Sequence, residues 1–182
     1  MMVLVIGGSG SGKSAYAESR ILSCSDASER YYLATMQIYG EEGQKKVQRH
    51  RMMRKEKGFE TIEQQTAIAG ALEKMKQPEN AAVLLECISN LTANEMFSEK
   101  VQVSGQEVTQ RVIADIKKMK RAVKHLIIVS NNVFEDGVLY DESTMEYIRA
   151  MGAVNQSLAQ MADEVIELVV GIPVFMKERQ TL

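Results

Sequence analysis

One eight-residue segment near the start of the chain constrains the fold more than any other feature. It reads GGSGSGKS over residues 7–14 and fits the pattern G-x-x-x-x-G-K-[ST], in the expected context of a preceding apolar strand and a following helix. The glycines let several backbone N–H groups point toward one phosphate, and the helix N-terminus adds partial positive charge. In this pattern Lys13 reaches the β- and γ-phosphates, and the Ser14 hydroxyl binds Mg²⁺.

The segment therefore predicts a site for a purine nucleoside triphosphate, GTP or ATP. The phosphate-binding residues predicted from the pattern are Gly7, Gly8, Ser9, Gly10, Ser11, Gly12, Lys13 and Ser14. The pattern leaves open which reaction the nucleotide serves, because many enzymes share it.

Short apolar runs alternate with segments of helical spacing along the rest of the chain. The runs are continuous, which is typical of strands covered on both faces. They are Met2–Ile6, Ala82–Leu85 and Leu126–Val129, with weaker runs at Tyr31–Ala34 and Val165–Val170. Helices are expected over Glu107–Lys124 and Ser143–Ala162, with a short one over Gln65–Lys76. This alternation predicts a single α/β domain over residues 1–182, with a doubly wound, mostly parallel sheet of the P-loop NTPase type and helices on both faces.

A carboxylate ends the apolar run at residues 82–85. In a doubly wound sheet, ligands bind at the carboxyl ends of the strands, where Glu86 is expected to lie. Glu86 would then hold Mg²⁺ together with Ser14, as the acidic residue of a Walker B strand does. The alternative is an exposed glutamate at a strand end with no function. The abrupt change from Val-Leu-Leu to a charge favours the magnesium role.

The charge balance and the rare residue types exclude several classes of protein. Lys plus Arg number 22 and Asp plus Glu number 24, so the net charge of −2 lacks the basic excess of a nucleic-acid-binding domain. The 2 cysteines lie far apart and predict neither a disulfide framework nor a zinc site, and 2 histidines nearly exclude a histidine-rich metal site. No apolar run reaches the roughly 18–20 residues that span a bilayer. We expect a cytoplasmic protein without a nucleic-acid partner.

The segment 45–57 is strongly basic and contains one of the two histidines, His50. On a helix, Lys46, His50 and Arg54 would share one face. Cations there would neutralise a triphosphate, and a neutral imidazole nitrogen can attack phosphorus. The alternative is a solvated basic helix face with an incidental histidine, and spacing alone does not exclude it. The other histidine, His125, directly precedes an apolar run and is expected to mark a helix-to-strand junction.

Several blocks of the chain resemble the bifunctional adenosylcobinamide kinase / adenosylcobinamide-phosphate guanylyltransferase family, in the same order and at near the same spacing. In chain order they read GGSGSGKSAYAE, YLATMQ, KVQRHRMMR followed by FETIE, VLLECISNLTANEMF, and GAVNQSLAQMADEV followed by GIPVFMK. The histidine-containing block and the GAVNQ block are far more specific to the family than the phosphate loop, which many families share.

The resemblance implies two reactions of cobalamin assembly. A nucleoside triphosphate phosphorylates adenosylcobinamide, and GTP then transfers GMP to that phosphate through a histidine–GMP intermediate, giving adenosylcobinamide-GDP. The matching histidine is His50. Beyond the phosphate loop, the nucleotide contacts that the resemblance implies are Ala15, Ala34, Thr35, Met36, Arg51, Met52, Met53, Arg54 and Glu63. A corrinoid substrate and a homotrimer are also implied.

The chain departs from the family pattern after the run at 126–129. The family carries a glutamate where the chain has Asn132, and a glycine where it has Phe134. Glu135 and Asp136 could supply a displaced carboxylate. The departure puts the kinase step in question and leaves the guanylyltransferase residues in place. Two alternatives stay open: a different small-metabolite kinase of the same fold, and a GTP-binding relative without catalysis.

Overall fold

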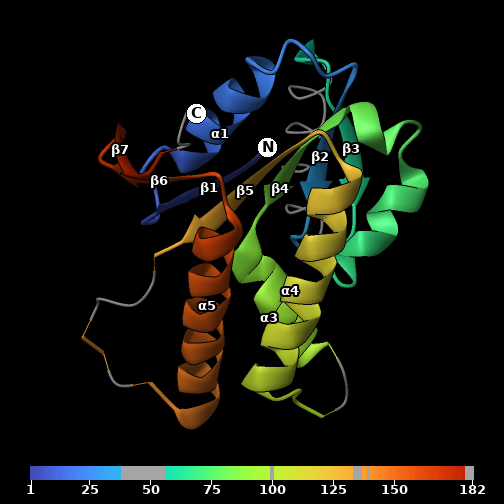
Figure 1. Ribbon diagram of the computed structural model, residues 1–182. Helices are drawn as coiled ribbons and strands as arrows, with labels where there is room; N and C mark the ends of the chain where they lie inside the picture. The colour runs from blue at the N-terminus through green and yellow to red at the C-terminus, as the bar shows by residue number, and fades with distance from the viewer. Residues whose placement is uncertain (38–55, 99–100, 133–136, 139, 179–182) are drawn as a thin grey trace.

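The computed structural model describes residues 1–37, 56–98, 101–132, 137–138 and 140–178. Thirteen elements follow one another along these residues (Figure 1). In chain order they are β1 Met2–Gly7, α1 Lys13–Leu22, β2 Glu29–Ala34, β3 Glu60–Glu63, the 3₁₀ helices η1 Ile68–Lys74 and η2 Pro78–Asn80, β4 Ala81–Glu86, α3 Ile88–Phe97, α4 Gly105–Ala122, β5 His125–Asn131, α5 Glu142–Met161, β6 Glu164–Val169 and β7 Ile172–Lys177.

The strands form one seven-stranded sheet in the order β3-β2-β4-β5-β1-β6-β7. Every neighbouring pair is parallel except β6 and β7, which are antiparallel. The strand β1 therefore lies between two strands that follow it by more than a hundred residues. The six strands β1 to β6 run in one direction. Their carboxyl ends therefore lie at a single edge of the sheet, where α/β proteins bind ligands. The predicted fold class is confirmed.

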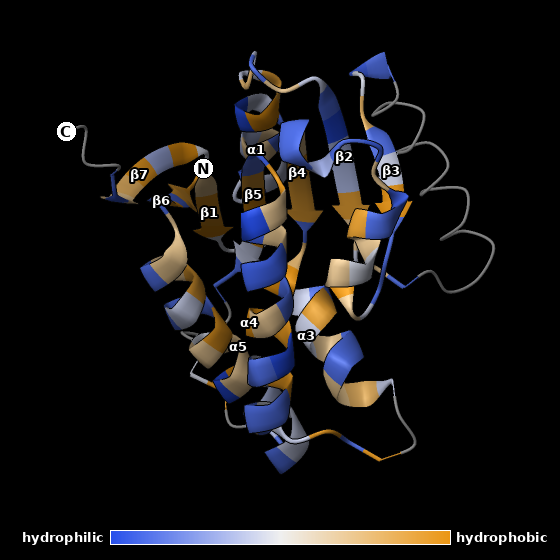
Figure 2. Cartoon of the chain, turned by 45° about the vertical axis from the view of Figure 1, so that its right-hand side comes forward, coloured by the Kyte–Doolittle hydropathy of each residue, from blue (hydrophilic) through white to orange (hydrophobic). Residues whose placement is uncertain are grey.

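Helices cover both faces of the sheet, and each face has its own core. Val3 and Val5 of β1 pack with Ala17 and Ile21 of α1 on one face. Met2 and Leu4 belong to the second core, to which α3, α4 and α5 also contribute. Figure 2 shows apolar strands between helices whose polar residues face outward, most clearly on α4. Each fully buried aliphatic side chain of these cores contributes roughly 1.5–3 kcal/mol to stability.

The helix expected over Gln65–Lys76 is a shorter 3₁₀ helix, η1. The first residues of the expected helix are not helical. Ala67 adopts a left-handed conformation with φ 47°, and its N–H donates to the carboxylate of Glu95 at 2.7 Å. The long helices α4 and α5 were predicted to within two residues at each end. Among the described helices, none is long and apolar enough to cross a membrane.

Two strands and one helix were not anticipated from the sequence. The strand β3 has only four residues, three of them polar, and α3 lacks a strong apolar periodicity. The strand β7 contains Pro173, which disfavours a strand interior, and all six of its residues are exposed. An edge strand tolerates proline because it needs ladder hydrogen bonds on one side alone.

The turn between β6 and β7 contacts the phosphate loop directly. Val170 and Gly171 form its two central residues, with φ values of 46° and 84°. Two positive φ angles in a two-residue hairpin are the pattern of a type I′ turn. The N–H of Gly171 donates to the carbonyl of Ser11 at 3.0 Å. The C-terminal hairpin therefore holds one side of the phosphate loop in place.

A β-branched residue rarely adopts a positive φ, so Val170 is strained in this turn. We predict that Val170→Asn, which creates the Asn-Gly sequence preferred in type I′ turns, raises the free energy of unfolding by about 1 kcal/mol. Urea denaturation followed by circular dichroism measures the change. Val174→Asn is the matched control, because Val174 is also exposed but lies within the strand. An equal gain in both variants would contradict the turn assignment.

Candidate active site at the phosphate loop

The loop that joins β1 to α1 has the conformation its glycines allow. Gly10 and Gly12 adopt φ values of 72° and 90°, which side chains other than hydrogen disfavour. The N–H of Ser11 donates to the carbonyl of Gly8 at 3.2 Å, closing a turn within the loop. Gly12 is the N-cap residue that directly precedes α1, and it provides no side-chain cap. The backbone thus curls around a space that faces the start of the helix.

The first turn of α1 is suited to an anion. It contains no acidic residue, and no side chain caps its N–H groups. Unsatisfied N–H groups at a helix N-terminus carry partial positive charge and bind phosphate. Lys13 is nine-tenths buried, and its ammonium group donates to the carbonyl of Gly8 at 2.9 Å. The lysine therefore lies folded over the loop, next to the space that a phosphate would fill.

Glu86 ends β4 beside the loop, as predicted. Its carboxylate accepts hydrogen bonds from two hydroxyl groups, Ser14 at 2.5 Å and Tyr32 at 2.8 Å. Glu86 is half buried and accepts two hydrogen bonds, which argues against an exposed glutamate without function at the strand end. Hydroxyl and carboxylate oxygens are the ligands that Mg²⁺ prefers, so the pair Ser14 and Glu86 fits the predicted magnesium site.

The register of the sheet brings two further predicted residues to the same edge. Ala34, the last residue of β2, lies opposite Glu63 of β3 on one side and opposite Glu86 of β4 on the other. Met36 lies just beyond and is half exposed. Ala34 and Glu63 thus lie at the same carboxyl edge of the sheet as Glu86, and the contact of these residues with a nucleotide stays a prediction.

Thr35 makes contacts that the sequence did not indicate. It is fully buried, and its hydroxyl both donates to the carbonyl of Cys87 at 2.9 Å and accepts from the N–H of Cys87 at 2.8 Å. Its own carbonyl accepts from the side-chain amide of Asn94 at 2.7 Å. Thr35 thus joins the ends of β2 and β4 to α3. Its predicted nucleotide contact is untested, but the hydroxyl already has two backbone partners.

A polar network on the α5 side fixes the end of β5. Asn155 of α5 is buried, accepts from the Ser130 hydroxyl at 2.6 Å, and donates to the carbonyl of Asn131 at 3.3 Å. Asn131 in turn donates to the hydroxyl of Ser89 at 2.7 Å. Asn155 belongs to the GAVNQ block, whose role the sequence did not reveal. The structure assigns it the task of holding the strand that ends beside the loop.

A partly buried phenol of α5, that of Tyr147, also contacts α3. Tyr147 donates to the carbonyl of Ser89 at 3.2 Å. Burial, with the nearby Cys87 thiol as a second cause, raises the pKa of Tyr147 to about 12. The phenol therefore stays protonated and remains a donor throughout the physiological range.

Several predicted residues lie outside the described part of the chain. They are His50, Arg51, Met52, Met53, Arg54, Glu135 and Asp136. The other histidine, His125, begins β5 as expected, at the amino end of the strand. Its ring bonds to Asp26 at 2.8 Å, and this hydrogen bond is the main reason why the pKa of the Asp26 carboxyl is lowered. His125 is thus a junction residue remote from the phosphate loop.

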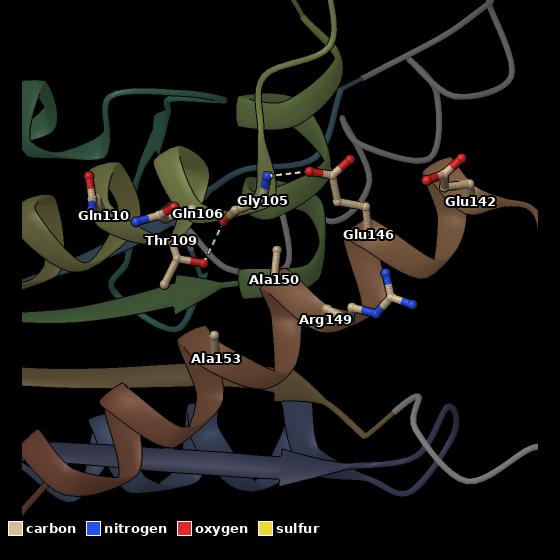
Figure 3. A pocket seen from close by; sticks show the side chains of 9 residues that line it. All are labelled: Gly105, Gln106, Thr109, Gln110, Glu142, Glu146, Arg149, Ala150 and Ala153. Carbon is tan, nitrogen blue, oxygen red and sulfur yellow. Dashed lines mark hydrogen bonds between the residues drawn. The ribbon is translucent and has the colours of Figure 1, made fainter.

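A groove lies between α4 and α5 (Figure 3). It has a volume of about 740 Å³, and among the described residues none of the predicted nucleotide-binding ones lines it. Its residue Glu146 accepts from the N–H of Gly105 at 2.7 Å and from Gln102 at 2.9 Å. This carboxylate therefore stabilises the first turn of α4, which gives it a structural role.

Several solved structures share the fold of this chain. The ATPase domain of G40P covers 100% of this chain and 78% of its own, with a TM-score of 0.60 and 15% identity. The KaiC-like protein PH0186 from Pyrococcus horikoshii OT3 covers 99% and 80%, with a TM-score of 0.58 and 13% identity. Identities this low support the P-loop ATPase fold alone.

Sequence comparison decides the family. The model of the family described as cobinamide kinase / cobinamide phosphate guanyltransferase matches residues 3–176. The chain belongs to this family. The bifunctional adenosylcobalamin biosynthesis protein CobU of Escherichia coli (strain K12) is 32% identical over 187 aligned residues, which cover 97% of this chain and 100% of that protein. The related CobP of Pseudomonas aeruginosa is 25% identical and covers 97% and 98%.

Two neighbouring glycines of the loop should respond differently to a methyl group in this cobinamide kinase family member. A Cβ at Gly7 would lie 2.6 Å from the Ser11 hydroxyl and 2.8 Å from the carbonyl of Leu168, whereas a Cβ at Gly8 would meet nothing within 4 Å. We predict that Gly7→Ala lowers the free energy of unfolding by roughly 1–3 kcal/mol. Gly8→Ala should fold normally yet weaken nucleotide binding, because its methyl group enters the open side of the loop.

Thermal unfolding measures the loss of stability, and titration with a fluorescently labelled GTP analogue measures the loss of nucleotide affinity. Equal thermal stability of Gly7→Ala and Gly8→Ala would refute the packing of Gly7 against β6. Unchanged affinity of Gly8→Ala would show that phosphate does not approach the loop from its open side.

The carboxylate of Glu86 should matter through its charge. We predict that Glu86→Gln weakens the Mg²⁺-dependent binding of GTP by roughly 10- to 100-fold, since an amide keeps the shape but loses the charge that attracts the ion. Tyr32→Phe is the matched control: it removes the other hydroxyl bonded to Glu86 and leaves the carboxylate. Calorimetric titration with GTP, with Mg²⁺ present or chelated, distinguishes them. Identical magnesium dependence in Glu86→Gln and the unmodified protein would rule the role out.

Proposed function

We propose that the chain phosphorylates adenosylcobinamide with a nucleoside triphosphate and then transfers GMP from GTP to the product, giving adenosylcobinamide-GDP. The observation that carries this proposal is the family match over nearly the whole chain, combined with a phosphate loop whose Lys13, Ser14 and Glu86 converge at one edge of the sheet. In the first reaction the substrate hydroxyl is the nucleophile, whereas the histidine–GMP intermediate of the second reaction needs a nucleophile from the protein.

The loop residues would position the triphosphate in both reactions. The N–H groups of the loop and of the first turn of α1 would bind phosphate oxygens. Lys13 would leave the carbonyl of Gly8 and neutralise charge on the β- and γ-phosphates. Ser14 and Glu86 would hold Mg²⁺, which supplies charge neutralisation on the phosphates when bound. Ala15, Ala34, Met36 and Glu63 are proposed as further nucleotide contacts: Ala15 follows the loop in α1, and Ala34 and Glu63 end neighbouring strands at the edge of the sheet where Glu86 lies.

His50 is proposed as the nucleophile of the second reaction. Its imidazole nitrogen would form a bond to the α-phosphorus of GTP as the bond to the bridging oxygen breaks, releasing pyrophosphate and a proton. A phosphate oxygen of adenosylcobinamide phosphate would then attack the same phosphorus and release the histidine. Arg51 and Arg54 would stabilise the leaving pyrophosphate. Splitting the transfer into two steps lets one phosphate site serve both reactions.

The proposed partners are small molecules: a corrinoid and a purine nucleoside triphosphate. A homotrimer in the cytoplasm is proposed from the resemblance, and the two free cysteines fit a reducing compartment. We propose no nucleic-acid partner, because positive and negative charges nearly balance and a nucleic-acid-binding domain carries a basic excess.

Incubation with α-labelled GTP and Mg²⁺ tests the proposal. We predict an acid-labile adduct with the mass of GMP, lost completely in His50→Ala because the nitrogen nucleophile is gone. His125→Ala, which removes the chain's other histidine at the remote end of β5, should keep the adduct. Intact-protein mass spectrometry and acid lability measure both.

The same assay separates the alternatives. Phosphoryl transfer without any adduct would indicate a different small-metabolite kinase. Binding of GTP with neither adduct nor turnover would indicate a non-catalytic relative. Loss of the adduct in both histidine variants would mean that the loss reflects misfolding or that the nucleophile is misassigned.

A further inference from the structure

A carboxylate of β6 contacts the residue that follows β5, beside the phosphate loop. Asn132 follows β5, and its backbone N–H donates to the carbonyl of Gly7 at 3.1 Å, so it lies directly beside the phosphate loop. Its side-chain amide donates to a carboxylate oxygen of Glu167 at 3.3 Å. Glu167 comes from β6, on the other side of β1, where it is registered with Ile6. Three adjacent strands thus bring Asn132, Gly7 and Glu167 together.

The position of Glu167 within its strand is unusual. Its neighbours Ile166 and Leu168 point into the apolar core beneath α1, so Glu167 points to the opposite face. Glu167 is half buried, and among the described residues the contact found for its carboxylate is the amide of Asn132 rather than a lysine or arginine. The other glutamate of β6, Glu164, is by contrast paired with Arg20 at 2.5 Å. A partly buried carboxylate without a cation is costly, which argues for a role beyond packing.

Within the part of the chain that the structure describes, no contact is found for the second oxygen of the Glu167 carboxylate. The Asn132 amide holds one oxygen, and an amide cannot itself take up a proton. A phosphoryl transfer to an alcohol needs a group that orients the hydroxyl and receives its proton. At the end of β5, Asn132 cannot meet this need, whereas Glu167 can.

We propose that Glu167 contacts the acceptor hydroxyl in the kinase reaction and receives its proton. The inference rests on the proposed function and concerns its first reaction alone. The hydroxyl oxygen forms a bond to the γ-phosphorus, the bond between that phosphorus and the β,γ-bridging oxygen breaks, and the nucleoside diphosphate leaves. The hydroxyl proton passes to Glu167 and then to solvent.

Substitution of Glu167 tests the proposal with two separate readouts. We predict that Glu167→Gln lowers kcat for phosphorylation of adenosylcobinamide by about 100-fold or more, because the proton acceptor is lost. Formation of the GMP adduct from GTP should be unchanged, since it needs no acceptor hydroxyl. Glu164→Gln, a change of the same chemistry on the same strand, should keep kinase activity.

A relocated carboxylate provides the rescue. In the double variant Asn132→Glu with Glu167→Gln, the two side chains exchange chemistry across the same contact, and we expect at least a tenfold recovery of kcat over Glu167→Gln. Thermal unfolding separates this role from a structural one: Glu167→Gln should lose kcat without a matching loss of thermal stability, whereas a residue that merely stabilises the fold would lose both together.

Three results would overturn the inference. They are full kinase activity in Glu167→Gln, a loss of activity in Glu135→Gln or Asp136→Asn with none in Glu167→Gln, and an unmodified protein that forms the GMP adduct but has no kinase activity. The third result would leave the guanylyltransferase half of the proposed function standing. Absence of the adduct with normal kinase activity would contradict the proposed function and leave the role of Glu167 intact.

Discussion

The pairing of β1 with strands on both of its sides is the constraint on which the rest of the molecule depends. Leu4 of β1 is registered with Ile128 of β5 and with Val165 of β6, so the first strand of the chain is held between two late ones. Because these strands are parallel, Gly7, Asn131 and Leu168 reach the same level of the sheet. Shifting this register by one residue would exchange the two core faces and disassemble the site.

Side chains at this edge are fixed by one another before any ligand binds. Thr35 is bonded to Cys87, Asn155 to Ser130, and Glu86 to Ser14. Each contact joins two different elements, so the strand ends cannot move independently. Such preorganised groups stabilise developing charge without paying for their own rearrangement during the reaction. The edge therefore combines rigid strand ends with the groups that the proposed chemistry requires.

The sequence predicted those features that a short, contiguous pattern of residues determines. The phosphate loop followed from its glycines and Lys13, and the place of Glu86 followed from a charge that ends an apolar run. The strands β3 and β7 were missed because four mostly polar residues and a proline-containing edge run lack the period of a buried strand. The contacts that Glu167 and Thr35 make were beyond prediction for a different reason. Their partners are distant in sequence, and only the register of the sheet brings them into contact.

The central place of β1 also bears on how the protein is made. The backbone N–H of Met2 donates to the carboxylate of Asp163, 161 residues later. The carbonyl of Ser11 likewise accepts a hydrogen bond from the N–H of Gly171, near the end of the chain. A ribosome therefore releases the phosphate loop first, yet the strand before it has no neighbour until β5 emerges. Until then an apolar strand stays open to water, where it can pair with the wrong partner. A nascent chain stalled before β6 would carry the complete loop motif without the turn that holds it.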